Sequence, residues 1–94
     1  MTLFSVRLTD SAAADLDKIS PEARRRLVDE IRKTGLHPFP PDPSAKKLKG
    51  FRPSLYRRRA GDFRILYRVE AETVFILRVI NRRDLERILR RLHL

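Results

Sequence analysis

Arginines occupy alternate positions in residues 56–68, whose sequence is YRRRAGDFRILYR. This stretch predicts two β-strands joined by a tight turn at its AGD segment. Because side chains alternate between the two faces of a strand, Arg57 and Arg59 should share one face of the first strand. Arg64 and Arg68 should share one face of the second strand in the same way. The residues between them are mostly apolar, so the hairpin is expected to present fixed positive charge that holds an anion.

Arginine chemistry at this hairpin would suit a cleavage of RNA that needs no metal. In that reaction the 2′-hydroxyl attacks the neighbouring phosphate, and preorganised cations stabilise the extra negative charge of the transition state. The corner 81–83, with sequence NRR, could bring further arginines to Arg57, Arg59 and Arg64. Arginine serves poorly as a general base, because its pKa exceeds about 12. The same basic face could therefore cut RNA or only bind it.

The composition indicates one small, strongly basic domain that spans residues 1–94, of which 41% are hydrophobic. Lysine and arginine total 22 against 12 acids, which gives a formal net charge of +10, and seventeen of these bases are arginine. The planar guanidinium suits bidentate contacts with phosphate, so nucleic acid or an acidic protein is the expected partner class. A basic surface without a specific function is the alternative.

Several cofactor and metal signatures are absent. The chain has no cysteine, which excludes disulfides and cysteine-based zinc sites, and His37 and His93 are its only imidazoles. It contains no GxxxxGKS or GxxxxGKT phosphate loop, no GxGxxG fingerprint and no HExxH pair. We therefore expect neither a cofactor nor a metal. No apolar run reaches transmembrane length, and the N-terminus is too polar for a secretory signal, so we expect a cytoplasmic protein without membrane contact.

The N-terminal third predicts a strand followed by two helices. Residues 3–8 alternate in polarity as a strand does, and Thr9 fits a helix N-cap. The segment 20–22, with sequence SPE, is a second helix start because it combines a capping serine, a proline at the first helical position and an acid. This second helix should end near Gly35. We expect the arginines at 24–26 to be solvated.

The middle of the chain predicts a loop and a basic segment. Residues 36–44 hold four of the six prolines, which indicates an extended connection outside the core. The AKKLKG segment that follows supplies Lys46, Lys47 and Lys49. These lysines could line the groove of the arginine hairpin or form an ordinary solvated cluster.

The C-terminal part predicts a buried strand and an amphipathic helix. Residues 73–80 form a nearly continuous apolar run, which is typical of a strand covered on both faces, and Asn81 fits the N-cap of the last helix. The apolar stripe of that helix consists of Leu85, Ile88, Leu89 and Leu92, with Arg87, Arg90 and Arg91 on its other side. The stripe could pack on the protein's own sheet, or it could leave that groove to a partner.

The order of these elements predicts an α+β fold. Three consecutive strands joined by short turns should make an antiparallel meander, with the helical hairpin packed on one of its faces. The arginines of the hairpin are then expected on the other face.

Two stretches of the sequence resemble a known family. LKG at 48–50 and YRRRAGDFRILYRVEAETVFILRVINRRDLERI at 56–88 resemble the C-terminal half of the RelE/ParE superfamily of type II toxins. The order of strands and helices is similar too, so the resemblance covers essentially the whole chain. It implies a RelE-like fold, in which an N-terminal strand and helical hairpin pack on an antiparallel sheet with a C-terminal helix. It also implies a toxin that a cognate antitoxin neutralises.

The resemblance also implies roles for particular residues. RelE-like members are ribosome-dependent endonucleases that cut mRNA, whereas ParE-like members inhibit DNA gyrase without nuclease activity. In the RelE-like pattern, the residues that grip the mRNA backbone and stabilise the transition state are Arg57, Arg59, Arg64 and Arg82. The accompanying candidates for RNA binding are Lys46, Lys47, Lys49 and Arg83. The candidates for partner binding are Leu85, Ile88, Leu89 and Leu92.

This chain departs from the RelE-like pattern at several positions. The tyrosine that such nucleases often carry beyond the last arginine has no counterpart, since the candidate positions hold Glu86 and Ile88. Asn81 stands where the family has a histidine. Arg58 stands where the family has an apolar residue, and it is expected to face the helices. His93 could serve as a base from the C-terminus, although an ordinary surface position is the alternative.

Three functions therefore stay open for this sequence. The first is a metal-independent endoribonuclease that acts on mRNA in the ribosome. The second is a ParE-like gyrase inhibitor, and the third is a catalytically degenerate homologue retained for binding an antitoxin. Toxin and antitoxin could also form a hetero-oligomer that binds operator DNA.

Overall fold

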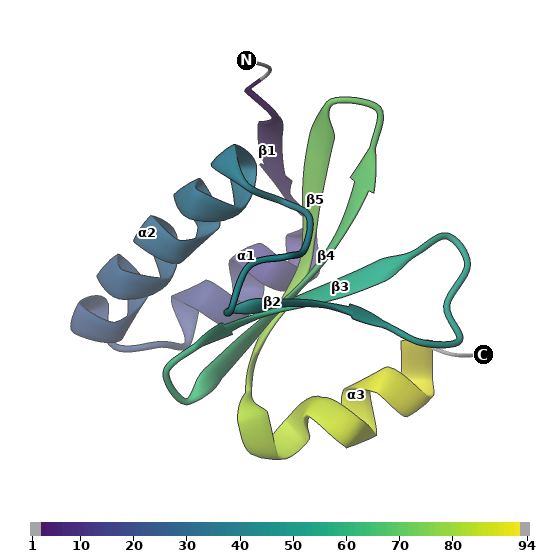
Figure 1. Cartoon of the computed structure of the whole chain (residues 1–94). Coiled ribbons are helices and arrows are strands. Elements are labelled where there is room, and N and C mark those ends of the chain that lie inside the picture. Colours follow the sequence, from purple (N-terminus) through teal and green to yellow (C-terminus); the bar gives the residue numbers. More distant parts are fainter. Residues whose placement is uncertain (1–2, 93–94) are drawn as a thin grey trace.

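A computed structural model describes residues 3–92 and shows one five-stranded sheet with helices on both of its faces (Figure 1). In chain order the elements are β1 (Ser5–Leu8), α1 (Asp10–Asp17), α2 (Pro21–Leu36), β2 (Ala45–Leu48), β3 (Leu55–Ala60), β4 (Phe63–Glu70), β5 (Thr73–Asn81), the 3-10 turn η1 (Arg82–Asp84) and α3 (Leu85–Leu92). The predicted α+β fold, with its helical hairpin and C-terminal helix, is confirmed.

The strands lie in the order β1-β5-β4-β3-β2. Strands β2 to β5 pair antiparallel, as a meander requires, whereas β1 pairs in parallel with β5, from Ser5 opposite Thr73 to Leu8 opposite Ile76. The predicted meander of three strands lacks β2, which the structure adds at the outer edge beside β3. Parallel pairing of β1 with the last strand is therefore the one exception to an antiparallel sheet among the described residues.

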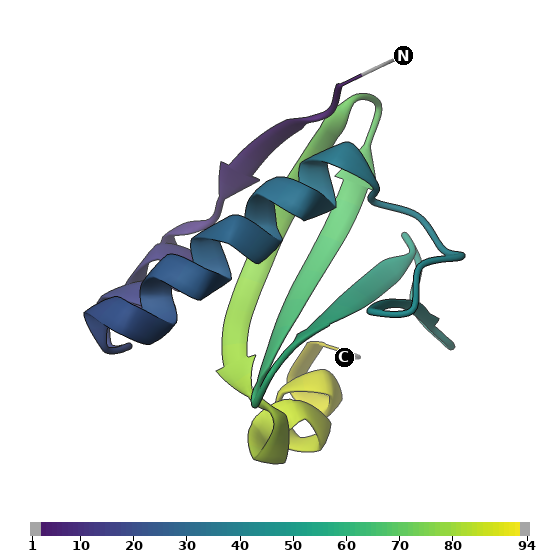
Figure 2. The same ribbon diagram turned by 60° about the vertical axis from the view of Figure 1, so that its left-hand side comes forward.

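Helices α1 and α2 cover one face of the sheet, which we call the helix face (Figure 2). Their apolar stripes are buried against aromatic and aliphatic side chains of the three central strands. The buried residues of this core are Ala12, Leu16, Leu27, Ile31, Tyr56, Ile65, Tyr67, Val74, Ile76 and Val79. Apolar residues with helical spacing in the first half of the chain therefore pack against apolar residues of the strands in the second half, and together they form one core.

Polar side chains begin both helices and join them to each other. The Thr9 hydroxyl accepts a hydrogen bond from the Ala12 backbone N–H at 3.1 Å and donates one to the Leu77 carbonyl at 2.9 Å, so it caps α1 and ties it to β5. Arg24 donates to the carbonyls of Leu16 and Ile19, each at 2.9 Å. Arg24 is therefore a bridge to the end of α1 and not the solvated side chain that the sequence predicts.

The proline-rich connection between α2 and β2 packs against the helix face more closely than expected. Pro38 is buried, and its carbonyl accepts a hydrogen bond from the Tyr67 hydroxyl at 2.8 Å. The ring of Phe39 makes edge contacts with Phe4 and Tyr56, with centroids 5.9 and 5.7 Å away. The connection bends at 39–41 and turns at 43–44, so it is not the extended segment outside the core that the sequence predicts, and part of it closes one end of the core.

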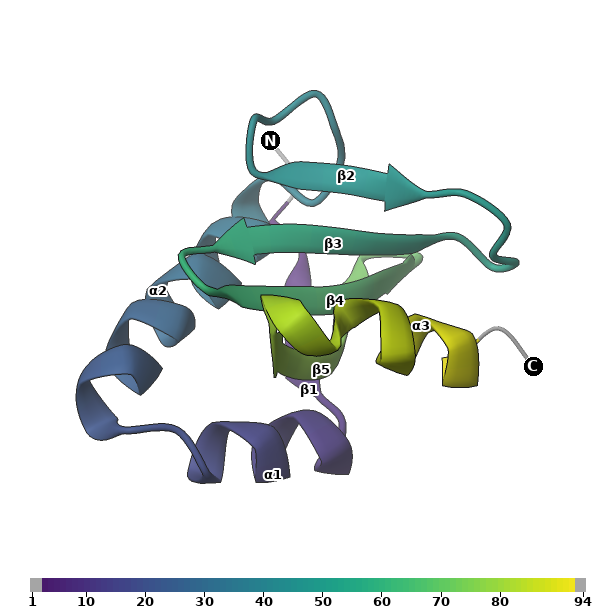
Figure 3. The ribbon, with the colours of Figure 1, turned by 90° about the horizontal axis from the view of Figure 1, so that it is seen from below.

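The opposite face of the sheet carries a smaller core beneath α3 (Figure 3). Leu55, Leu66 and Ile80 of three neighbouring strands contact this helix, whose Ile88 is buried at 4% exposure. Neighbouring residues along a strand therefore serve different cores, since Tyr56 points to the helix face and Leu55 to α3. The structure shows α3 docked on the protein's own sheet, one of the two arrangements that the sequence left open.

Candidate functional site

The β3–β4 hairpin places three arginines on the sheet face that also carries α3, which we call the arginine face. Arg59 pairs directly with Arg64 across the two strands, and Arg57 pairs with Leu66, whose side chain lies in the core under α3. Residues that pair directly point to the same face of a sheet, so all three arginines project to one side. Arg68 lies on the same face but farther along β4, opposite Phe75.

Arg82 reaches the same place from the end of β5. Phe63 pairs with Asn81, so the residue after Asn81 lies beside the hairpin turn. The Arg82 backbone N–H donates to the Asp62 carbonyl at 2.8 Å, and Arg82 Nε lies 3.8 Å from the Asp62 carboxylate. We call Arg57, Arg59, Arg64 and Arg82 the arginine cluster. The structure thus brings together the four residues that the sequence singled out for catalysis.

The electrostatics of Arg64 show how closely the four charges act together. Partial burial lowers the pKa of its guanidinium, and the positive charges of Arg57, Arg59 and Arg82 lower it further, while Asp62 opposes them. An arginine keeps its proton under such conditions, so the repulsion persists in the free protein. An anion bound among these side chains would relieve it.

Backbone carbonyls hold three of the cluster side chains in place. Arg64 donates to the Gly61 and Phe63 carbonyls at 3.0 and 2.9 Å. Arg57 donates to the Ser44 carbonyl and Arg59 to the Pro43 carbonyl, each at 3.3 Å. Carbonyls orient the guanidinium groups without cancelling their charge, as a carboxylate would. Three guanidinium groups of the cluster are therefore oriented by partners that leave their positive charge in place.

The predicted RNA-binding lysines differ in where they point. Lys46 pairs with Arg57 and so lies on the arginine face, whereas Lys47 pairs with Tyr56 and points to the helix face. Lys49 follows the end of β2 and is exposed. Arg83 is exposed beside the cluster, and the Asn81 side chain accepts hydrogen bonds from its backbone N–H and its Nε. Strand β2 therefore adds Lys46 alone to the side of the cluster.

Arg58 points to the helix face, as expected, where it is only 2% exposed. It donates to the His37 carbonyl at 2.9 Å and approaches the Asp42 carboxylate at 3.5 Å and that of Glu30 at 4.0 Å. Sequence reasoning placed Arg58 correctly but did not find these partners, because the two acids lie on α2 and in the proline-rich connection. Its contacts are those of a residue that holds the fold together.

The arginine face carries no histidine or tyrosine in the part of the chain from 3 to 92. Tyr56 and Tyr67 point to the helix face, and burial raises the pKa of Tyr67 to about 12. His37 lies on the helix side with Arg58, and His93 lies outside the described residues. The described part of the chain therefore supplies the cluster with cations but with no ordinary proton acceptor of these two types.

The predicted partner-binding stripe is largely covered by the protein's own sheet. Leu85, Ile88 and Leu89 pack on the smaller core, and Leu92 is 36% exposed. A partner that uses this stripe would have to displace α3 or bind beside its end.

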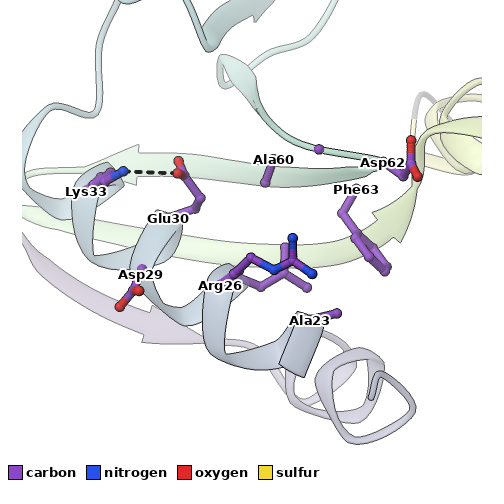
Figure 4. A pocket seen from close by; sticks show the side chains of 10 residues that line it. Ala23, Arg26, Asp29, Glu30, Lys33, Ala60, Asp62 and Phe63 are labelled. Carbon is purple, nitrogen blue, oxygen red and sulfur yellow. Dashed lines mark hydrogen bonds and ion pairs between the residues drawn. The ribbon is translucent and has the colours of Figure 1, made fainter. Parts of the chain in front are cut away.

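A cavity that the sequence did not reveal lies behind the hairpin turn, on the helix face. It has a volume of about 470 Å³ and lies between α2 and the turn that joins β3 to β4 (Figure 4). Its lining is mixed, with Ala23, Ala60 and Phe63 beside Arg26 and a Glu30–Lys33 ion pair of 3.2 Å. Only the folded chain brings these segments together.

Residues 3–92 offer no candidate for a metal site or for a membrane-spanning helix. These residues contain no group of three histidine, cysteine, aspartate or glutamate side chains that could hold a metal. None of the helices in this part of the chain is long and apolar enough to span a membrane.

The fold defines a small α+β protein whose arginine cluster lies on the same face of the sheet as α3. Residues 6–86 match the family model described as the ParE toxin of the type II toxin-antitoxin system, parDE. The chain therefore belongs to this family of type II toxins, within the RelE/ParE superfamily that the sequence resembles. No curated protein sequence matches it significantly.

Solved structures of the superfamily share this fold. A chain of the RelBE2 toxin-antitoxin complex of Mycobacterium tuberculosis is 28% identical with a TM-score of 0.73, over 85% of this chain and 99% of that one. A chain of the archaeal RelE-RelB complex of Pyrococcus horikoshii is 27% identical with a TM-score of 0.72, over 87% and 97%. A mutant of Escherichia coli RelE, at 16% identity and a TM-score of 0.62 over 90% of each chain, shares the fold.

Proposed function

We propose that this toxin is a ribosome-dependent endoribonuclease that cuts mRNA, with the arginine cluster at its centre. The observation that supports this function is the convergence of Arg57, Arg59, Arg64 and Arg82 on one open face. Three of these side chains are held by carbonyls, so their charge is free to meet a phosphate. The sequence resemblance to RelE-like toxins implies the same four positions.

The proposed reaction is transfer of the phosphoryl group to the neighbouring 2′-oxygen. A bond forms between the 2′-oxygen and phosphorus, and the bond from phosphorus to the 5′-oxygen breaks. The products are a 2′,3′-cyclic phosphate and a 5′-hydroxyl. The cluster would bind the non-bridging oxygens and stabilise the additional charge of the five-coordinate transition state. Removal of one such donor from an active site typically costs about 10² to 10³ in rate.

The two protons of this reaction need partners outside the cluster. The 2′-hydroxyl loses a proton, the 5′-oxygen gains one, and an arginine does neither efficiently at neutral pH. We assign these transfers to groups of the ribosome–mRNA complex. Because the arginine face carries no histidine or tyrosine within residues 3–92, the toxin would cut only where the ribosome–mRNA complex supplies these proton-transfer groups, which accounts for dependence on the ribosome.

We further propose a cognate antitoxin as the physiological partner, in the cytoplasm. The similar chains of M. tuberculosis and P. horikoshii come from toxin-antitoxin complexes. The described residues present two surfaces suited to an acidic partner, the cluster itself and the edge of β2 with its exposed lysines. An added strand or helix there would mask the cluster.

Mapping of mRNA 5′ ends after induction of the toxin without antitoxin tests the nuclease proposal. New 5′-hydroxyl ends within translated regions are expected for the wild type, and their loss for Arg64→Gln and Arg82→Gln. Arg25→Gln, an exposed change on α2, is the control for charge and should keep them. Growth arrest with intact transcripts would count against the proposal, and unaffected growth would indicate a degenerate toxin.

Gyrase inhibition is the second candidate function, and two observations favour it. The matching family model is that of a ParE toxin, and the arginine face offers no histidine or tyrosine within residues 3–92. A protein that only binds gyrase needs no proton acceptor. Inhibition of gyrase supercoiling by the purified protein, with ribosome-bound mRNA uncut, would select this function.

A further inference from the structure

Helix α3 turns a row of arginines away from the sheet. Leu85, Ile88 and Leu89 pack on the smaller core, so the opposite side of the helix faces solvent (Figure 3). That side is basic. Arg87, Arg90 and Arg91 of α3 are exposed there, and Arg83 of the preceding turn η1 is exposed too; we call these four residues the outer stripe.

Three members of the outer stripe have the spacing of one helical surface. Arg87, Arg90 and Arg91 stand at i, i+3 and i+4 of α3 and extend for about 6 Å at 1.5 Å per residue, and Arg83 precedes them in the 3-10 turn. One of the four charges is partly compensated, since Arg87 lies 3.3 Å from the Asp84 carboxylate. Asp84 belongs to η1, and the acid of α3 itself is the exposed Glu86. The stripe therefore keeps a positive surplus that no packing requirement of the helix explains.

The outer stripe faces the same side of the molecule as the arginine cluster, because α3 lies on the arginine face. The turn η1 joins Arg82 of the cluster directly to Arg83 of the stripe. A helix with its side chains is about 10 Å thick, so the stripe stands about one helix diameter above the sheet. A strand of RNA on the cluster would run beside α3, and the outer stripe would meet whatever surrounds that strand.

The composition of this surface favours an RNA backbone over a protein. Interfaces between proteins are usually centred on buried apolar or aromatic residues, and the outer stripe offers none, because the leucines and the isoleucine at 85, 88 and 89 are packed on the sheet. A surface that binds a phosphate backbone needs only cations spaced to meet successive phosphates, and arginine binds a phosphate bidentately. The charge and the absence of an apolar anchor therefore point to the same ligand.

We propose that the outer stripe docks the toxin on the phosphate backbone of ribosomal RNA beside the mRNA path. This inference rests on the proposed ribosome-dependent function, which supplies the RNA that would surround the bound strand. It assigns two tasks to two surfaces: the cluster holds the phosphate to be cut, and the outer stripe holds the toxin on the ribosome.

Cosedimentation of the purified protein with purified ribosomes, over a range of salt concentrations, tests the proposal. The test variant is Arg87→Gln/Arg90→Gln/Arg91→Gln, and the matched control is Arg7→Gln/Arg25→Gln/Arg32→Gln on β1 and α2. Both lower the formal net charge from +10 to +7. The slope of log affinity against log salt should become shallower by about two to three for the test variant, at about 0.7 to 0.9 for each of three lost phosphate contacts. The control should keep the slope of the wild type.

Two further arms separate the possible outcomes. The lysine variant Arg87→Lys/Arg90→Lys/Arg91→Lys should restore ribosome binding, and thermal melting of every variant shows whether the fold is intact. Equal salt slopes for test and control variants would overturn the inference. So would loss of antitoxin binding by the test variant while its ribosome binding stays unchanged, which would make the stripe a protein surface.

The proposed nuclease function can fail separately from this inference. If mRNA stays uncut but the test variant alone loses ribosome binding, the docking surface stands and the nuclease function does not. If the test variant cuts mRNA as the wild type does and binds ribosomes equally well, the nuclease function stands and the docking surface does not.

Discussion

Arg59 and Arg64 face each other directly across the β3–β4 ladder, two like charges at a paired position. Directly opposed like charges destabilise a sheet, since cross-strand pairs of this kind contribute roughly 0.2–1 kcal/mol. Carbonyls hold both side chains and cancel neither charge. The free protein therefore carries a repulsion at the position where a phosphate is proposed to bind.

Sulfate or phosphate should stabilise the protein through this pair. An anion that binds only the folded state raises its stability by RT ln(1 + [L]/Kd), where [L] is the free anion concentration, so the melting temperature should rise with sulfate beyond its rise in chloride of equal ionic strength. Arg64→Gln should lose most of this specific increase and be equally or slightly more stable without the anion. Arg7→Gln, on the exposed edge strand β1, should behave as the wild type. Equal sulfate responses of Arg64→Gln and Arg7→Gln would contradict an anion site at the pair.

Loss of Arg58 should destabilise the fold much more than loss of its neighbour. Arg58→Ala removes a buried guanidinium and leaves Asp42 without its cationic partner, whereas Glu30 keeps Lys33; the loss should cost about 3 kcal/mol of unfolding free energy. Arg59→Ala, at an exposed position, should stay within about 0.5 kcal/mol of the wild type. Urea denaturation of both variants measures the difference. Similar midpoints for the two would show that the buried contacts contribute little.

Asp42 should make stability depend on pH in the acid range. The Ser44 backbone N–H donates to its carboxylate at 2.8 Å, and this bond, aided by the charge of Arg58, lowers the pKa of Asp42 below 3.8 although burial opposes the shift. A lowered folded-state pKa stabilises the protein above the unfolded-state pKa, and this contribution is lost as the pH falls through the folded-state pKa. Asp42→Asn should therefore melt below the wild type at pH 7.

The gap between these two melting temperatures should narrow as the pH falls below about 3.8, the usual pKa of the group. Thermal melts from pH 2 to pH 7 measure the gap. A constant gap over this range would mean that the ionised carboxylate has no special role.

Docking of α3 should depend on its inner side chains. Leu85→Asp/Leu89→Asp places two carboxylates against Leu66 and Ile80, and we expect the unfolding free energy to fall by more than about 2 kcal/mol. Leu92→Asp, at a position 36% exposed, should have a much smaller effect. The melting temperature and the affinity for the antitoxin report the change. If both stay the same in the double variant, the helix does not need these contacts.

Local patterns predicted much of this fold and of the cluster. Alternation predicted that Arg57 and Arg59 share a face and that Arg58 points the other way, because the period of a strand leaves no other choice. The helix caps at Thr9 and Ser20 could also be predicted from the sequence, because each depends only on residues within one helical turn. To predict that Arg82 lies beside the hairpin arginines, one also had to infer that short connections join the strands into a meander.

Features that depend on contacts between distant segments could not be predicted from the sequence. Strand β2 has only four residues, two of them lysines, and such charged edge strands lack the apolar alternation by which a strand is recognised. The bridge from Arg24 to α1 and the cavity behind the turn each require the packed positions of separate elements. Neither has a signal within a single stretch of sequence.

Parallel pairing of β1 with β5 also means that the first strand of the chain has its partner in the last strand. Within residues 3–92, β1 has no other strand partner, and its neighbour Thr9 is 68 positions from the Leu77 carbonyl that it contacts. A growing chain that has reached β4 can form the hairpin with its arginines, but β1 still lacks its partner. Long-range pairing of this kind slows folding, since the loop must close before the contact is gained. The basic β3–β4 hairpin can therefore form before β1, the strand at the other edge of the sheet, pairs with β5.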